Sequence, residues 1–447
     1  MSKAGVLNHS PFVPYDEKVV LYGTWPSRPY AIPWEYTGWR DESLAWKSSC
    51  YIHGNLNPSP TWLIKGPDAL KFLSSYLVNG LKAFEVGMAR HGIMCRDDGI
   101  LVGDGVLLRT DEDEFISQWM APYIAYVFDQ VKDQYDAKAE TLTNKVFLFQ
   151  IAGPKSLAIL EKASGDKFRD IKFMHHRMTS FNGMPVRILR LGMAGTLSYE
   201  LHGDIDHAHD IYNMVLEAGK EYGIRRLGYH TYMMNHTEDG FPQAYYHFPY
   251  PWAEDEKLKA WLGAATKSTQ STDLALLGSM GPDIKLRYRN PVELGWERAI
   301  NFNHEFVGKE ALQKLVAEKP RTMVTLEWNK EDIIDIYRSQ FEPGEPYANM
   351  DRPYHFRYEE GRETLYADRV LDKDGSMIGI SSGRAYSYHY RQMISLCSIN
   401  TQYSELGTEV FVLWGNPGTR QKKIRAVVAR FPYLNEARNE DVDVSKL

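Results

Sequence analysis

The chain has 447 residues, of which 43% are hydrophobic and 25% charged, and its formal net charge at pH 7 is −6. This chain is too long to fold around one hydrophobic core of ordinary size. At about 150 residues per domain, its length predicts about three domains. A slightly acidic chain without a basic block excludes nucleic acid as an expected partner.

The cysteines and the amino-terminal segment indicate in which cell compartment the protein is expected. Cys50, Cys95 and Cys397 show no CxxC spacing and cannot all pair within one chain, so reduced thiols are the simplest interpretation. Residues 1–14 lack a basic segment followed by an apolar core, and no later run approaches the roughly 20 apolar residues of a membrane span. We therefore expect a cytoplasmic protein without membrane contact.

The first 145 residues are expected to hold an extension and a domain. Residues 1–45 are rich in aromatic residues and proline, which predicts an ordered extension that wraps the body or a neighbouring subunit and leaves a homo-oligomer open. Residues 46–145, completed by residues 240–320, are expected to form the first domain. Gly103 and Gly105 interrupt a β-type run, where a bend or a close ligand approach is expected. A strand and two helices are expected at 61–65, 68–77 and 122–132.

Residues 146–239 are expected to form a second domain, and residues 321–447 a third. The order of strands and helices in the second domain predicts an α+β fold with mixed sheets. The third shows short strands separated by glycine, proline and aspartate turns, which predicts a small β-barrel or sandwich. Further helices are expected at 154–163, 205–222, 255–262 and 309–318.

Two stretches far apart in the chain hold the residues most suited to chemistry. One is GMAG at residues 192–195 followed by Tyr199 and Glu200, and the other is GYHTY at 228–232 followed by EDG at 238–240. A buried carboxylate such as Glu200 can accept the two parallel N–H donors that the cyclic guanidine edge of a pterin presents.

Further motifs follow in a fixed order along the chain. They are GPDAL at residues 66–70, QIAGPK at 150–155, NPVELGW at 290–296, FVGKEAL at 306–312 and GTEV at 407–410. Together they resemble the glycine-cleavage T-protein (aminomethyltransferase) family over roughly residues 46–433. Residues 39–46, 103–105 and 190–195 are most similar to its tetrahydrofolate-dependent aromatic O-demethylases of lignin-degrading bacteria, the vanillate and syringate demethylases.

The resemblance implies a three-domain clover and a one-carbon reaction. A methyl or methylene group leaves a heteroatom and is received at N5 of tetrahydrofolate. The expected reaction is O-demethylation of a guaiacyl-type aromatic, which gives a phenol and 5-methyl-tetrahydrofolate. Such a transfer needs an in-line approach and stabilisation of the departing phenolate.

The resemblance also implies roles in catalysis. Tyr232 stands where the aromatic O-demethylases place their essential tyrosine, and it is the first candidate for a donor to the phenolate. Tyr30 and His53 are further acid–base candidates. Asp104 matches the acidic residue near N5 in the aminomethyltransferases. An ordinary packing or turn role is the alternative for each of them.

Three residues are expected to serve the cofactor. Glu200 and its neighbour Tyr199 are expected to bind the pterin, and Glu238 is expected to anchor the loop that carries Tyr232. No metal is expected, because no histidine or cysteine set has zinc spacing. Five histidines are expected on the surface or in loops: His175, His176, His202, His207 and His209.

Two departures from the family pattern concern the substrate. Residues 52–58 lack the family's FDxSHM element, and Met120 stands where vanillate-type demethylases carry an arginine. A thioether cannot imitate an arginine–carboxylate fork, so we expect a substrate without a carboxylate, or a larger neutral phenolic dimer. The following residues are expected to line its pocket: Met120, Trp119, Asn55, Tyr245 and Tyr246.

Two other functions stay open. A formaldehyde lyase would remove a hydroxymethyl carbon from a lignin-derived dimer by acid–base chemistry, with or without folate. The lost loop motif and Met120 favour this function, whereas Glu200 favours methyl transfer. A folate-binding relative without catalysis is the third alternative.

Overall fold

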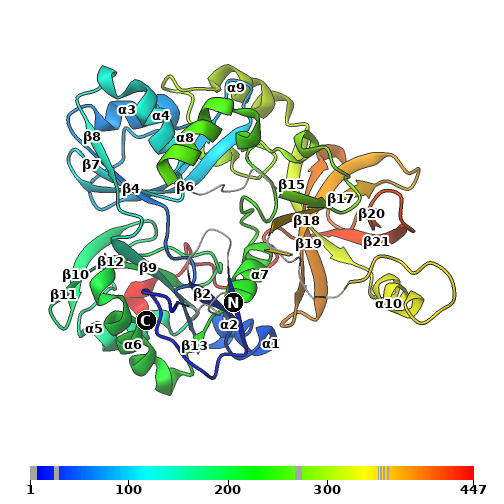
Figure 1. Cartoon of the computed structure of the whole chain (residues 1–447), viewed down its shortest axis with the longest axis horizontal. Coiled ribbons are helices and arrows are strands. Elements are labelled where there is room, and N and C mark those ends of the chain that lie inside the picture. The colour runs from blue at the N-terminus through cyan, green and yellow to red at the C-terminus, as the bar shows by residue number, and fades with distance from the viewer. Residues whose placement is uncertain are drawn as a thin grey trace, which may run out of the picture.

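The computed structural model describes residues 8–24, 30–266, 274–350, 352, 355, 358–359 and 362–447. Three lobes, each built on its own sheet, surround a common centre (Figure 1). This arrangement confirms the predicted α+β class and the three-domain clover. Across the described residues no helix has both the length and the apolar character of a membrane span.

The first lobe is a five-stranded antiparallel sheet in the order β5-β6-β7-β4-β8. Its strands are β4 (Thr61–Lys65), β5 (Ala89–Cys95), β6 (Leu101–Asp111), β7 (Glu114–Gln118) and β8 (Lys138–Thr141). Its helices are α3 (Ala69–Tyr76) and α4 (Tyr123–Val131), joined by α8 (Glu256–Thr266) and α9 (Lys309–Glu318) from later in the chain. The return of α8 and α9 to this lobe closes its core.

Strand β6 continues through Gly103 and Gly105, the two glycines that interrupt the β-type sequence pattern. A side chain at Gly105 would lie 2.1 Å from the carbonyl oxygen of Gln118 and 2.8 Å from the amide nitrogen of Met120. The close approach expected there is therefore an approach of the neighbouring strand β7 and the loop after it. Glycine is required because the pairing leaves no room for a Cβ atom.

The second lobe is a mixed six-stranded sheet in the order β10-β11-β12-β9-β3-β13. Its strands are β3 (Tyr51–His53), β9 (Val146–Ala152), β10 (His176–Phe181), β11 (Met184–Leu189), β12 (Ser198–Asp204) and β13 (Arg225–Arg226). Helices α5 (Ser156–Ser164) and α6 (Ala208–Gly219) cover one face. Strand β3, which lies within the segment expected to form the first domain, pairs with β9 of this sheet.

The third lobe is a closed barrel. The strands follow the path β17-β18-β19-β15-β21-β20, and β20 pairs again with β17. The bounds are β15 (Arg321–Trp328), β17 (Arg362–Leu371), β18 (Met377–Ser387), β19 (Gln392–Asn400), β20 (Glu409–Trp414) and β21 (Lys422–Ala429). Three smaller elements accompany it: β14 (Leu274–Leu277), β16 (Tyr358–Glu359) and α10 (Lys330–Ser339). The predicted C-terminal barrel is confirmed.

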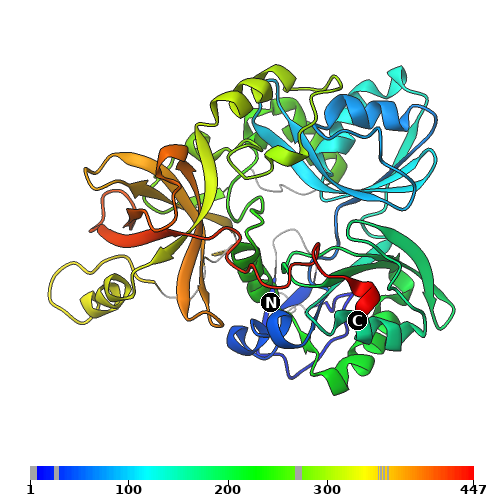
Figure 2. The same ribbon diagram turned by 180° about the vertical axis from the view of Figure 1, so that it is seen from behind.

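The segments near both ends of the chain pack onto the second lobe. Phe12 and Val13 are buried in its core, and so are Leu434 and Val444. Residues 1–7 and 25–29 of the expected extension lie outside the described ranges. The amino-terminal part also contains β1 (Leu21–Thr24), β2 (Ala31–Glu35), α1 (Trp39–Glu42) and α2 (Ala45–Ser48). Figure 2 shows the red C-terminal segment crossing from the barrel to the second lobe.

Helix α7 (Tyr229–Asp239) lies between the second lobe and the barrel and contacts β2 and β18. The expectation that Tyr232 lies on a loop is therefore wrong. Gly228 precedes the helix, and Gly240 ends it in the left-handed conformation with φ 75°. All eleven residues of α7 are buried, so the segment has no polar face from which a helical period could be read.

The buried carboxylate of Glu42 connects the amino-terminal segment to the start of α7. It accepts hydrogen bonds from the amides of Tyr36 (2.6 Å), Thr37 (3.0 Å) and Gly228 (2.8 Å), and from the Thr231 hydroxyl (2.9 Å). Burial raises the pKa of Glu42, and these four donors oppose that shift. The carboxylate thus takes the place of a capping side chain at the first turn of the helix.

Removing this carboxylate should destabilise the fold. Glu42→Ala leaves four donors without their acceptor, three of them buried, and each buried donor left unpaired costs ~1–3 kcal/mol. We expect a clear fall in the urea concentration at the midpoint of unfolding, measured by tryptophan fluorescence. The matched control is Glu85→Ala, which removes an exposed glutamate, and equal midpoints for the two variants would contradict this role of Glu42.

Candidate functional site

Strand register in the second lobe brings three polar side chains into one row. His53 of β3 lies opposite Gln150 of β9, and Gln150 lies opposite Glu200 of β12. Directly paired residues project from the same face of a sheet. All three are buried, on the face opposite the one that α5 and α6 cover.

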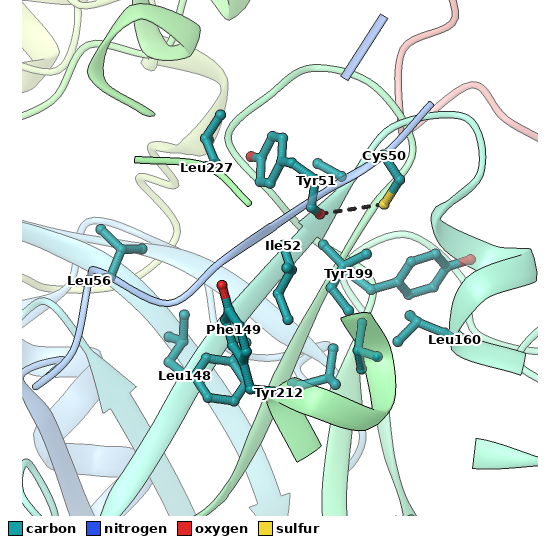
Figure 3. Close-up of a cluster of buried hydrophobic side chains, with 14 of the residues drawn as sticks. Cys50, Tyr51, Ile52, Leu56, Leu148, Phe149, Leu160, Tyr199, Tyr212 and Leu227 are labelled. Atoms are coloured by element: carbon teal, nitrogen blue, oxygen red, sulfur yellow. Dashed lines mark hydrogen bonds between the residues drawn. The ribbon is translucent and has the colours of Figure 1, made fainter. Parts of the chain in front are cut away.

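The next row of the same strands projects to the other face. It consists of Ile52, Ile151 and Tyr199. Figure 3 shows Tyr199 beside Leu160 of α5, within the hydrophobic core. The structure therefore does not bring Tyr199 to Glu200, because neighbouring residues of a strand point to opposite faces.

Glu200 is 4% exposed and holds two side-chain donors. Gln150 donates from Nε2 to Oε1 over 2.9 Å, and His202 lies with Nε2 3.1 Å from Oε2. A carboxylate offers about four acceptor positions, so these two contacts leave acceptor capacity for two more donors. The remaining acceptor positions of the carboxylate therefore fit the paired N–H groups of a pterin.

Gln150 is itself oriented by two further side chains. The Tyr51 hydroxyl lies 3.4 Å from Oε1 of Gln150, and Asn235 of α7 donates to the Tyr51 hydroxyl over 3.2 Å. With Oε1 engaged in this way, the amide nitrogen faces Glu200. The sequence did not indicate this series of hydrogen bonds. The motif at residues 150–155 was the only sign of a role for Gln150.

Tyr232 of α7 covers the His53 end of the row. The two rings stack with centroids 4.3 Å apart and an interplanar angle of 6°. Nδ1 of His53 donates to the Leu227 carbonyl (2.8 Å), since a carbonyl oxygen only accepts. Burial raises the pKa of Tyr232 well above its usual value, and the Glu200 charge raises it further. The Tyr232 hydroxyl is therefore held in its protonated form.

Asp104 comes from the first lobe. His91 of β5 places Nε2 2.9 Å from Oδ2, and the Tyr250 hydroxyl donates to Oδ1 over 2.5 Å. Leu108, on the same face of β6, packs with Leu189, and Leu189 is the direct neighbour of Glu200 in the second sheet. The face of β6 that carries Asp104 therefore contacts, at Leu108, the face of the second sheet that carries Glu200.

Other predicted residues support the walls of this region. Asn55 donates to the same Leu227 carbonyl as His53 (3.2 Å), and also to Pro33 (3.0 Å). The Tyr30 hydroxyl donates to the carbonyl of Asn57 (3.3 Å). These contacts tie the amino-terminal segment to the strand that carries His53.

Glu238 lies in the last turn of α7 and forms a buried ion pair with Lys47. Burial lowers the pKa of Lys47 to about 8, and Glu238 opposes this shift. The Glu238 carbonyl accepts the Leu434 amide (2.7 Å). These contacts fix the end of the helix that carries Tyr232.

Apart from Asn55, the predicted pocket residues lie in packing contacts. Met120 is 0% exposed in the core of the first lobe, where its thioether fills the space beside Gly92. Trp119, with φ 73°, packs against the core of the second lobe. Tyr245 meets the edges of other buried rings, and Tyr246 is buried beside α7. The structure thus shows these aromatic residues in packing contacts.

Two of the five histidines expected at the surface or in loops are not there. His176 is buried on β10, where burial lowers its pKa to about 3. His202 lies on β12 and contacts Glu200. In the described part of the chain, no three His, Cys, Asp or Glu residues form a group that could hold a metal ion.

Comparisons with known proteins agree with this geometry. The glycine cleavage system aminomethyltransferase T of Bartonella henselae has the same fold, with a TM-score of 0.67, 16% identity and coverage of 94% of this chain and 96% of that one. The chain is also 41% identical over 424 residues to the sesamin methylene transferase of Sinomonas sp. strain No.22, with 93% of each chain covered. It is 29% identical over 443 residues to the syringate O-demethylase of Sphingobium sp. strain SYK-6, with 94% of each covered.

These relatives show that the chain is an enzyme of one-carbon transfer. Residues 26–247 match the model of the GCVT N-terminal domain, and the chain belongs to the GCVT family of aminomethyltransferase-like proteins, within the branch that includes the sesamin and syringate enzymes.

Proposed function

We propose that this protein transfers a one-carbon unit from the oxygen of an aromatic ether to tetrahydrofolate and releases a phenol. The arrangement of Glu200 carries the proposal, because a buried carboxylate with capacity for two more donors suits a pterin. The names of two relatives, a methylene transferase and an O-demethylase, support the reaction class.

Tetrahydrofolate, when bound, supplies the amine nitrogen that receives the carbon. Glu200 would hold the pterin edge, with Gln150 and His202 fixing the carboxylate. A charge-assisted hydrogen bond of this kind contributes ~1.5–3 kcal/mol. Asp104 would face the cofactor from the first lobe.

Tyr232 would act on the departing oxygen. A phenol has a pKa of about 10, so a free phenolate leaves an ether poorly near neutral pH. The raised pKa of Tyr232 keeps its proton available until negative charge develops on the phenolic oxygen. The stacked ring of His53 holds the tyrosine in one orientation, so the donor is preorganised.

The substrate is proposed as a methoxylated or methylene-bridged aromatic ether. Met120 carries no argument about the charge of that substrate, because its side chain lies in the core of the first lobe. Incubation with sesamin, syringate and neutral guaiacyl ethers, and separate assays of 5-methyl- and 5,10-methylene-tetrahydrofolate, would identify the transferred unit. Formaldehyde released without folate would instead support the lyase, which gains no support from the comparisons.

Glu200→Gln is expected to weaken tetrahydrofolate binding by roughly ten- to a hundredfold, because it loses one charge-assisted hydrogen bond of ~1.5–3 kcal/mol. Titration calorimetry measures the change. Tyr199→Phe is the matched control, since the neighbouring Tyr199 projects into the core and should leave the affinity unchanged. The pterin assignment fails if both variants bind as tightly as the parent.

Tyr232→Phe is expected to lower kcat by about 10²–10⁴-fold while KM changes little, because the hydroxyl acts on charge that develops in the transition state. Steady-state assay of phenol release measures both constants. Tyr212→Phe, at another buried tyrosine whose hydroxyl contacts Tyr36, should keep kcat near that of the parent. A rise in KM alone would assign Tyr232 to binding.

A further inference from the structure

His91 and Asp104 form a polar pair on the face of the first lobe that lies against the Glu200 row. Their side chains are 22% and 12% exposed, whereas His53, Tyr232 and Glu200 are all at most 4% exposed. The pair is therefore more open to solvent than the polar groups of the Glu200 row. His91 was not among the residues that the sequence indicated.

The His91 ring is held in one orientation. Two neutral rings meet it in edge-to-face arrangements: Trp296 with centroids 4.6 Å apart at 88°, and Phe241 at 5.1 Å and 61°. The third contact is Nε2 to Oδ2 of Asp104, at 2.9 Å. An ionised carboxylate only accepts hydrogen bonds, so neutral His91 carries its proton on Nε2 and leaves Nδ1 as an acceptor.

Asp104 is fixed in turn by Tyr250. The tyrosine hydroxyl donates to Oδ1 and accepts from the Asp104 amide at 3.1 Å. Burial raises the pKa of Tyr250 well above its usual value, and the charge of Asp104 raises it further, so the hydroxyl remains the donor. A carboxylate held in this way fixes the tautomer of a histidine and stabilises its protonated form.

We propose that His91, oriented by Asp104 and Tyr250, is the base that accepts the proton of the amine receiving the one-carbon unit. The inference rests on the proposed function. An N–C bond forms as the C–O bond of the ether breaks. The N–H proton passes to Nδ1 of His91, and a proton from Tyr232 passes to the phenolic oxygen. One proton is taken up and one released, so no oxidant or further reactant is needed.

The first test needs no turnover. Nitrogen-15 NMR of the histidine rings in the folate-free protein should show His91 with its proton on Nε2. In Tyr250→Phe, which removes one donor to Asp104, the His91 ring signals should shift. A neutral His91 with its proton on Nδ1 would overturn the assignment.

The second test separates His91 from Asp104 as the base. In His91→Gln the amide nitrogen still donates to Asp104, but the glutamine side chain cannot take a proton. We expect the dissociation constant of tetrahydrofolate to stay within about threefold and kcat to fall by about 10²–10³-fold. His209→Gln, at an exposed histidine of α6, should leave both unchanged. A kcat for His91→Gln within threefold of the parent would assign the proton to Asp104 and overturn the proposal.

The third test is rescue of His91→Ala by added imidazole. Recovery of activity that increases with the concentration of free imidazole base is expected, and a merely structural role would not produce it. If the variant folds and binds folate but imidazole restores nothing, the proposal is overturned. A parent protein that neither binds tetrahydrofolate nor transfers a one-carbon unit would instead overturn the proposed function.

Discussion

The register of β3, β9 and β12 is the constraint on which the site depends. It sets His53, Gln150 and Glu200 side by side on one face and leaves Ile151 and Tyr199 for the core on the other. A shift of one residue in this pairing would exchange the two sets. The enzyme therefore needs the apolar packing of α5 and α6 as much as it needs the polar residues, because that packing specifies which side chains face the site.

Burial gives these polar groups their chemical character. An isolated charge placed in a protein interior costs several kcal/mol, and a paired one much less. Each buried acid of the second lobe accordingly has partners: Glu200 has Gln150 and His202, and Glu42 has four donors. Tyr232, in contrast, is neutral, and desolvation raises its pKa, which makes it a weaker acid. Its hydroxyl therefore stays a hydrogen-bond donor toward the negative charge that develops on a departing phenolate.

The sequence predicts the local elements well and the site only in part. Helix α9 was expected at 309–318 and is found there, because its amphipathic pattern is strong. Helix α7 was missed because it is buried on every side. Met120 was expected in the pocket, but the structure places it in the core of the first lobe beside Gly92 of β5. This contact depends on how distant strands pair, which local sequence patterns do not reveal. The partners of Glu200 come from strand register, and His91 from a separate lobe, so neither follows from spacing along the chain.

The C-terminal segment has a consequence for how the molecule is made. Arg190 binds Asn439 across 249 positions of sequence, and the Asn439 amide donates to the Gly195 carbonyl. Contacts of such long separation form late, because the chain between them must be ordered first. During synthesis the lobe that carries Glu200 will have emerged from the ribosome well before residues 434–447. The segment at residues 190–198 must therefore wait without its C-terminal partners while the barrel folds, and a partly folded chain with exposed surface is prone to aggregation.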